Sequence, residues 1–349
     1  MKRLDVVIVG FGIAGASIAR ELRARGKRIL VIDASKKSAT AIAGGTIHPA
    51  VLRYYNKVWR ADEFWPTAKV VYQDWEQELG LTLLDKRGLM RLFDSEQERE
   101  IWQQKREDPF WRDYLNPLEA VSSKPHPNIN APFGTGNSDE FWRFDPAQLL
   151  DNYRHHLIQS GQYIQSQLVF DDEQSLFCAI NDLGYETDSV VLAQGHQQDL
   201  WPGLVRGNPI LSKQGQYLII DCPGLNLTRI LKSKFFVIPL GHDRYQVGAT
   251  YPHNRDSNSL EAARERLFDE LTSILKKPFK VREYWTGIRP GTKDRKPILG
   301  ALNTERKIYV YNGLNSRGLL MAPLLSSWLA DFMLEDKDLP KEISINRFF

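Results

Sequence analysis

Cysteine is scarce in this sequence of 349 residues, which contains only Cys178 and Cys222. The two residues lie far apart, and neither belongs to a C-x-x-C pair or to a set with metal-ligand spacing. The sequence therefore gives no indication of a disulfide framework, a zinc site or a dithiol redox centre. We expect two reduced thiols and no metal.

An excess of charge of one sign is also missing, because 46 Lys and Arg residues oppose 43 Asp and Glu residues and leave a formal charge of +3. A nucleic-acid-binding protein usually shows a stronger basic bias. Hydrophobic residues make up 42% and charged residues 26%, which is typical of a soluble globular protein. Composition alone therefore favours a globular chain without a nucleic-acid footprint.

The sequence has no apolar run of the ~18 residues that a membrane span needs. Its first segment, "MKRLDVVIVGFGIAGASIA", begins with basic residues, but Asp5 and regularly spaced glycines interrupt the apolar stretch. A secretory leader has a continuous apolar region instead. We expect a cytoplasmic protein without a membrane partner, and no sequence pattern specifies its oligomeric state.

Two short β-branched runs near the N-terminus predict buried parallel strands, at residues 5–9 and 28–34. Between them, "ASIARELRARG" (16–26) has apolar residues at helical spacing and ends at Gly26. Strand, helix and strand in this order predict a βαβ unit.

The first turn of this unit carries the glycine pattern G-x-G-x-x-G between strand and helix, at Gly10, Gly12 and Gly15. In a dinucleotide site these glycines permit a tight turn, close approach to a pyrophosphate and close packing of helix on strand. The helix N-terminus supplies free N–H groups for the phosphates. Asp33 ends the second strand, where its carboxylate would accept hydrogen bonds from ribose hydroxyls.

Three further segments favour FAD over a nicotinamide cofactor. "AIAGGTIHP" (41–49) offers backbone that could lie against a flat ring, "SVVLAQG" (189–195) returns a strand to the site, and "NGLNSRG" (312–318) opens a helix near the C-terminus. The dipole of that last helix would stabilise an anionic reduced flavin. We expect non-covalent FAD. The full set expected at the cofactor is Gly10, Gly12, Ile13, Ala14, Gly15, Asp33, Ala34, Ala43, Gly44, Gly45, Thr46, Val169, Ala193, Gly195, Gly287, Asn315, Ser316, Arg317, Gly318 and Leu319.

The remaining chain predicts a second, mixed part. Helical aromatic-rich segments fill much of 56–116, and alternating strands follow at 214–220, 234–240 and 244–250. We predict an α/β fold with a Rossmann-like FAD-binding domain and an α+β substrate domain on a mixed, largely antiparallel sheet. Other elements are expected as a strand at 88–93, a loop at 122–140, and helices at 144–161 and 259–277. The predicted domains are 1–55, 143–213 and 286–349 for FAD, and 56–142 and 214–285 for substrate.

Two C-terminal segments, "WTGIRPGTKDRKPILG" (285–300) and "NGLNSRGLLMAPLLSSWLA" (312–330), carry a family resemblance. Together with the dinucleotide motif, they resemble the D-amino-acid-oxidase superfamily of FAD-dependent oxidoreductases over nearly the whole chain. The likeness is closest to glycine oxidases and to the flavin domain of bacterial enzymes that modify tRNA wobble uridines. The resemblance implies FAD-dependent oxidation of an amine.

The resemblance also implies that Arg289, in the G-x-R-P segment, binds the substrate carboxylate. A guanidinium is always charged and grips a carboxylate through two parallel hydrogen bonds. The apolar neighbours Trp285, Ile288 and Pro290 would exclude water from that pair. The alternative is structural, an ion pair between Arg289 and Asp294, because a buried arginine needs a partner.

Two other residues have open roles. Arg317 aligns with an arginine near the flavin in the same families, where it would contact substrate or cofactor, or else clamp the flavin loop. His48 is a candidate for covalent flavin attachment, but a histidine before proline is more often a turn residue. The residues expected at the substrate are Arg289, Phe236, Tyr251 and His48, with Arg289 and Arg317 as the catalytic candidates.

Two departures from the family pattern concern the substrate. Phe236 stands where glycine oxidases carry a tyrosine, so a hydroxyl that would orient a small amino acid is missing. Gln214 replaces an arginine usual before "GQ". Tyr217, Tyr245 or Tyr251 would be able to supply a hydroxyl instead.

We therefore predict oxidation of a carboxylate-bearing amine, an amino acid or an N-substituted glycine, by hydride transfer to flavin N5 and hydrolysis of the imine. One alternative is the same chemistry on tRNA, the removal of carboxymethyl from a carboxymethylaminomethyl-uridine. Basic segments such as "LRYYNKVWR" (52–60) are present, but charged runs are more often solvated faces. The second alternative is a non-catalytic flavin-binding protein.

Overall fold

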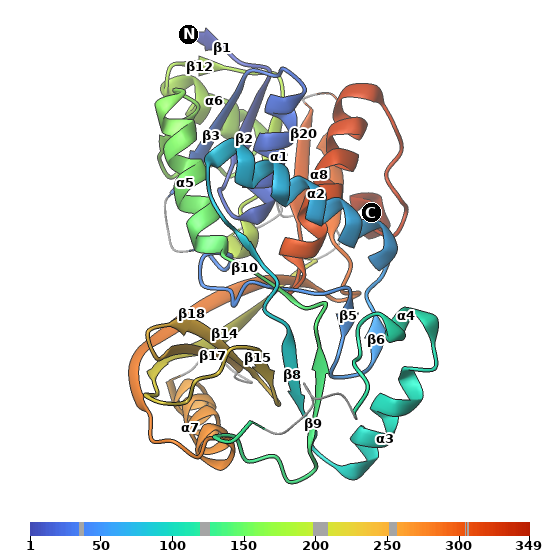
Figure 1. Cartoon of the computed structure of the whole chain (residues 1–349). Coiled ribbons are helices and arrows are strands. Elements are labelled where there is room, and N and C mark those ends of the chain that lie inside the picture. Colours follow the sequence, from blue (N-terminus) through green and yellow to red (C-terminus); the bar gives the residue numbers. More distant parts are fainter. Residues whose placement is uncertain (35–37, 119–125, 198–208, 251–256, 304, 306) are drawn as a thin grey trace.

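The structure is a computed structural model of the whole chain and describes residues 1–34, 38–118, 126–197, 209–250, 257–303, 305 and 307–349. Two sheets organise these residues, with a six-stranded sheet in the upper half of Figure 1 and a seven-stranded sheet in the lower half. No helix in the described ranges combines the length and the apolar character that a membrane crossing requires.

The six-stranded sheet has the order β11-β3-β2-β13-β20-β19 and is parallel except for the edge strand β19. Its strands are β2 (Val6–Val9), β3 (Ile29–Asp33), β11 (Tyr163–Gln165), β13 (Val190–Leu192), β19 (Ile298–Asn303) and β20 (Ile308–Asn312). The predicted βαβ unit is confirmed, with helix α1 (Ile13–Ala24) between β2 and β3. This is the parallel sheet expected of a Rossmann-like fold.

Helices cover both faces of this sheet. Alternate strand residues point to opposite sides, so Val6 and Ile8 join one core while Val7 and Val9 join another. On the first side lie α1, α2 (Ala61–Leu79), α5 (Pro146–Gln159) and α8 (Gly318–Glu335); on the second lie α6 (Glu173–Asp182) and the 3₁₀ helix η3 (Ile345–Phe348). Asp145 caps α5 as predicted, because its side chain accepts a hydrogen bond from Gln148 N.

The seven-stranded sheet has the order β18-β14-β17-β16-β15-β8-β9 and is antiparallel except between β15 and β8. Helix α7 (Ser257–Ile274) packs on one face of it, where Leu267 and Leu271 meet Leu218 and Val247. The strands are β8 (Leu89–Leu92), β9 (Thr135–Ser138), β14 (Ile210–Asp221), β15 (Ile230–Lys232), β16 (Phe236–Gly241), β17 (Arg244–Thr250) and β18 (Lys280–Thr292). The predicted mixed, largely antiparallel sheet is confirmed.

Smaller elements complete the chain. Helix α3 (Glu96–Lys105) contacts β9, and helix α4 (Pro109–Arg112) follows α3 along the chain. A three-stranded sheet links β4 (Thr46–Ile47), β10 (Trp142–Phe144) and β7 (Leu84–Asp85). Two further strand pairs join β1 (Lys2–Arg3) to β12 (Tyr185–Glu186), and β5 (Ala50–Val51) to β6 (Asn56–Lys57). A single turn of 3₁₀ helix, η2, spans Gly195–Gln197.

Two features differ from the sequence interpretation. The segment 122–140, predicted to be a loop, contains the buried strand β9, because Gly136 leaves room for the rings of Phe93 and Trp102. The long strand β18 was not anticipated. The two-domain division remains a prediction, and two of its boundaries fall inside β14 and β18.

Candidate active site

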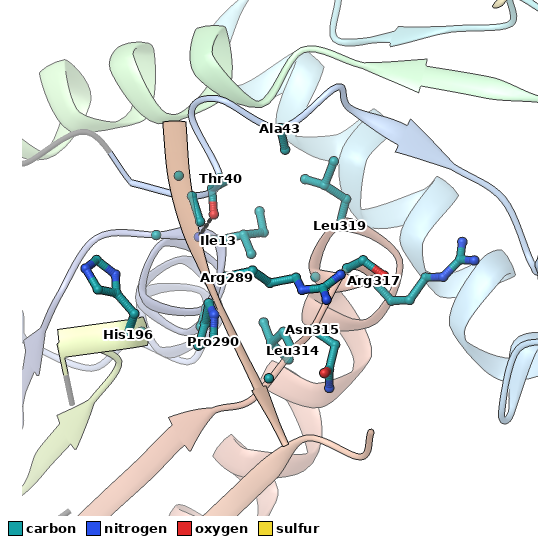
Figure 2. A pocket seen from close by; sticks show the side chains of 18 of the residues that line it. Ile13, Thr40, Ala43, His196, Arg289, Pro290, Leu314, Asn315, Arg317 and Leu319 are labelled. Carbon is teal, nitrogen blue, oxygen red and sulfur yellow. Dashed lines mark hydrogen bonds between the residues drawn. The ribbon is translucent and has the colours of Figure 1, made fainter. Parts of the chain in front are cut away.

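A cavity of about 1380 Å³ lies where the carboxyl ends of the parallel strands meet one face of the mixed sheet. Pockets for single small ligands are usually ~300–1,000 Å³. The cavity is therefore larger than a typical pocket for one small ligand. Figure 2 shows residues from α1, β18 and the start of α8 arranged around this space.

The three fingerprint glycines are required for different reasons. A Cβ on Gly10 would lie 2.6 Å from Ala193 O, and one on Gly15 would lie 2.0 Å from Gly10 O, so both are needed for packing of the turn. Gly12 is different, since the nearest atom to its Cβ position is Thr40 Oγ1 at 3.5 Å. Gly12 lines the cavity at the start of α1, where free N–H groups and the helix dipole favour phosphate. The turn thus fits a pyrophosphate.

Asp33 ends β3 beside this turn. Its Oδ1 accepts a hydrogen bond from Phe11 N at 3.0 Å, and its Oδ2 accepts one from the Tyr163 hydroxyl at 3.2 Å. These bonds hold the carboxylate at the mouth of the dinucleotide turn, and the side chain lines the cavity. The position suits the predicted contact with ribose hydroxyls.

The glycines of the 43–46 segment are explained by the protein itself. A Cβ on Gly44 would lie 2.5 Å from Ile238 Cδ1, and one on Gly45 would lie 1.8 Å from the Phe144 carbonyl oxygen. The loop is further fixed by Gln246 Nε2, which donates to Ile42 O at 2.9 Å. The loop therefore rests on β16 and β17 and forms one wall of the cavity. Its contact with a flavin ring stays a prediction.

The C-terminal glycine turn brings a second helix N-terminus to the cavity. A Cβ on Gly318 would lie 2.9 Å from Ile13 Cγ2, so α8 begins directly against α1. Asn315 ties the turn to β18, since its N–H donates to Pro290 O at 3.1 Å. Two positive helix ends consequently face one cavity, which favours anionic ligands there.

Arg289 lies on β18, opposite Lys213 of β14. Figure 2 shows its side chain extending across the site toward the turn that carries Arg317. Asp294 does not pair with it, because Asp294 Oδ2 accepts from Arg347 Nε at 2.8 Å and Asp294 Oδ1 accepts from Lys296 N at 3.0 Å. The alternative ion pair between Arg289 and Asp294 is therefore wrong.

His48 and Arg317 lie together. The ring of His48 is buried, stacks on Phe141 with centroids 4.8 Å apart, and accepts a hydrogen bond from Ala50 N at Nδ1. Burial, together with the charge of Arg317, lowers the pKa of His48 to about 3, although the hydrogen bond with the Ala50 backbone opposes this shift. Arg317 Nη1 donates to His48 O at 3.5 Å. His48 thus forms the turn expected before Pro49, and Arg317 fixes that turn to α8.

Nearly all the predicted site residues come together in this cavity. The exceptions are Gly15, which packs behind the dinucleotide turn, and Tyr251, which lies outside the described residues. The predicted residues that line the cavity are Gly10, Gly12, Ile13, Ala14, Asp33, Ala34, Ala43, Gly44, Gly45, Thr46, His48, Val169, Ala193, Gly195, Phe236, Gly287, Arg289, Asn315, Ser316, Arg317, Gly318 and Leu319.

Of the tyrosines that the sequence offered as a source of a hydroxyl, Tyr217 lines the cavity and Tyr245 does not, because Tyr245 joins the core beneath α7. Side chains alternate between the two faces of a strand, so Lys213, Gly215 and Tyr217 of β14 share one face, the face that lines the cavity. Thr40 and Lys232 had no comparable signal in the sequence.

Positive charge dominates the lining. Among the described residues, the lining includes ten Lys and Arg side chains and three carboxylates, Asp33, Asp171 and Asp294. The last of these is bound to Arg347. A cavity with this balance favours anionic ligands.

Known proteins resemble the chain over nearly its full length. The profile of the DAO family, described as FAD dependent oxidoreductase, matches residues 5–332. The glycine oxidase of Pseudomonas aeruginosa is 24% identical over 94% of this chain and 94% of that protein. The bifunctional protein ThiO/ThiG of Trichormus variabilis is 24% identical over 96% of this chain. The match covers only 53% of the length of ThiO/ThiG. The crystal structure of glycine oxidase from Geobacillus kaustophilus superposes with a TM-score of 0.79, covering all of both chains at 20% identity.

Proposed function

The chain belongs to the DAO family of FAD-dependent oxidoreductases, and from this premise we propose that it oxidises the C–N bond of an N-substituted glycine or another carboxylate-bearing amine. The observation that carries the proposal is the position of Arg289. Its guanidinium extends into a cavity that has the dinucleotide turn on one side and the mixed sheet on the other. A carboxylate bound there would lie beside the cofactor.

The bound FAD would supply a hydride acceptor for the substrate's α-C–H bond, and water would then hydrolyse the imine product to a keto or aldehyde compound and an amine. The protein's own contribution is placement. Arg289 would hold the carboxylate, and Ile42 and Leu319 would exclude water from the reacting atoms. Gly12, Thr40 and Asp33 would hold the dinucleotide, which we propose is bound without a covalent link.

Phe236 favours, as the substrate, an amino acid with a substituent on its nitrogen over a free small amino acid. It lies half-buried in the cavity wall, 6.3 Å from the ring of Phe141, and it offers an apolar surface without a hydroxyl. Such a surface suits a substrate with additional bulk on the nitrogen. N-substituted glycines meet this requirement.

The test is anaerobic reduction of the bound flavin, followed by loss of its visible absorption, with a panel of N-substituted glycines and of D- and L-amino acids. We expect bleaching by at least one N-substituted glycine. If no carboxylate-bearing amine bleaches the flavin, the proposal is wrong and the non-catalytic alternative is favoured.

A tRNA substrate remains a prediction with its own test. Phosphate contacts give binding that weakens steeply with salt. Titration of the protein with tRNA at low and at moderate salt would reveal such a slope. The absence of binding at low salt would eliminate a tRNA substrate.

A further inference from the structure

A lysine is buried in the wall of the cavity, in a row of residues that crosses the mixed sheet. Lys232 of β15 lies between Arg91 of β8 and Phe236 of β16. The row continues through Gly248 of β17 to Tyr217 of β14. Lys232, Phe236 and Tyr217 all line the cavity. The lysine therefore belongs to the same sheet surface as the residues in front of the proposed substrate site.

Lys232 has unusual surroundings for a charged side chain. The residue is only 7% exposed, its Nζ donates to Ser233 O at 2.7 Å, and it lies 4.7 Å from the centre of the Phe236 ring. In the part of the chain that the structure describes, Lys232 forms no ion pair with a carboxylate. Buried charges are normally paired, because removal from water costs several kcal/mol.

The two nearby carboxylates are held by another residue. Glu98 accepts two hydrogen bonds from Arg91, at 2.7 and 2.9 Å, and Asp94 accepts one at 3.2 Å. Arg91 thereby holds both carboxylates on its side of the row, and its Nη1 donates to Ser233 O, the same acceptor that Lys232 Nζ uses. Lys232 lines the cavity beside this cluster without a hydrogen bond to either carboxylate.

A second cation acts on Lys232, because the charge of Arg53, which also lines the cavity, lowers the lysine's pKa. Lys234 lines the cavity as well, but it is exposed and forms an ion pair with Glu270. Of the described lining carboxylates, Asp33 lies beside the dinucleotide turn, Asp294 is bound to Arg347, and Asp171 forms no ion pair with Lys232. This end therefore combines apolar walls with positive charge and has no acidic partner among the described lining residues.

We propose that Lys232, with Arg53, binds a second anionic group of the substrate, at the end of the nitrogen substituent. The substrate class becomes N-substituted glycines whose substituent ends in a carboxylate or phosphate, with the first carboxylate at Arg289. This inference rests on the proposed function, since it names the substrate of the same site. Phe236 would pack against the carbon chain that joins the two ends.

The ionisation of Lys232 agrees with this role. Burial and the charges of Arg91 and Arg53 lower the pKa of Lys232 to about 7, opposed by Asp94 and Glu98. A bound anion in direct contact with the ammonium group would add an opposite charge and raise the pKa again. Affinity for the second anion should therefore fall as the pH rises above 7, because the free lysine then loses its charge.

The test compares three substrates in anaerobic flavin reduction: N-(2-carboxyethyl)glycine, its neutral isostere N-(2-carbamoylethyl)glycine, and N-(2-phosphonoethyl)glycine. Comparison of the carboxylate and phosphonate substrates shows which of the two anionic groups the site prefers. We expect the protein to prefer an anionic arm over the amide. Lys232→Met should weaken binding of the preferred anion by about ten- to hundred-fold and abolish the preference, and Lys232→Arg should restore part of it.

Lys280→Met is the matched control, because it removes a lysine from the same sheet at the exposed end of β18, away from the cavity. FAD content and melting temperature of each variant exclude a folding defect. The inference is wrong if the protein shows no preference for an anionic arm, or if Lys232→Met keeps that preference.

A dead-end ligand separates this inference from the proposed function. 3-(Carboxymethylthio)propanoate has both carboxylates and no amine, so it binds without being oxidised. If no amine reduces the flavin, the proposed function fails. Binding of the dead-end ligand by the unaltered protein, lost in Lys232→Met, would still support the anion site, and equal binding by both would overturn it.

Discussion

Asp294 forms an ion pair with Arg347, whose Nε lies 2.8 Å from Asp294 Oδ2. The same guanidinium donates to the carbonyl oxygens of Lys296 and Pro297, so it fixes the C-terminal 3₁₀ helix to the strand that follows the Arg289 segment. Burial raises the pKa of Asp294, but the hydrogen bonds that its carboxylate accepts from Arg347 and from the Lys296 N–H outweigh burial and lower it. Asp294 therefore has a structural role close to a residue for which we propose a substrate role.

The two roles predict opposite phenotypes. Arg289→Ala should keep FAD and the melting temperature but reduce flavin reduction by carboxylate-bearing amines by at least about ten- to hundred-fold, because a charge-assisted pair worth roughly 1.5–3 kcal/mol is lost. Asp294→Asn should lower the melting temperature and keep most of the reduction rate. Differential scanning fluorimetry and stopped-flow absorbance measure the two effects. Normal reduction by Arg289→Ala would refute the carboxylate assignment.

Gly12 and Gly15 should respond differently to alanine. Gly12→Ala meets no protein atom closer than 3.5 Å, so the chain should fold and bind FAD at least about tenfold more weakly, because the methyl group occupies the path of the pyrophosphate. Gly15→Ala forces a Cβ to 2.0 Å from Gly10 O, so we expect a lower melting temperature even without FAD. Fluorescence titration with FAD measures the loss of affinity in Gly12→Ala, and thermal melting of the apoprotein measures the loss of stability in Gly15→Ala. Wild-type FAD affinity in Gly12→Ala would contradict the phosphate role.

Phe236→Tyr restores the hydroxyl that the related families carry at this position. The new group would face the cavity beside Lys232, where it would hydrogen-bond a small substrate. We expect kcat/KM for glycine or N-methylglycine to rise about three- to ten-fold, the equivalent of one neutral hydrogen bond. Steady-state kinetics with glycine and with a long N-substituted glycine checks this. An equal gain in kcat/KM for both substrates would argue against a role of Phe236 in selecting substrates with a large substituent on the nitrogen.

His48 should make stability depend on pH in the acidic range. Its pKa is lowered to about 3 in the folded protein, against about 6.5 in an unfolded chain. The unfolded state then takes up a proton first, so the stabilisation present above pH 6.5 is lost as the pH falls toward 3. Between pH 7 and pH 5 the free energy of unfolding should fall by about 2 kcal/mol from this group.

Chemical unfolding at several pH values measures this slope. His48→Gln, which cannot titrate, is the comparison, and its stability should vary less between pH 7 and pH 5. An identical slope in both proteins would show that other groups cause the pH dependence.

Local patterns of the sequence determined the parallel layer. The runs that became β2 and β3, the helical spacing of α1 and the glycines at 10, 12 and 15 each act within a few residues, so their structure is readable without the rest of the chain. The same holds for the cap of α5 by Asp145. The cofactor class followed from these patterns together with the resemblance of the C-terminal segments.

Tertiary structure decided which distant residues meet. Lys232 faces Phe236 because β15 and β16 pair in one register, and a shift by one residue would turn either side chain to the opposite face. Asp294 reached Arg347 rather than Arg289 for a similar reason, since the C-terminal 3₁₀ helix packs beside β19. Charge and apolar character are properties of single residues, but the partner of a buried charge depends on strand register and packing across the whole chain. The sequence alone therefore predicted an FAD-dependent oxidoreductase, and the folded sheet brought together the residues for which we propose anion binding.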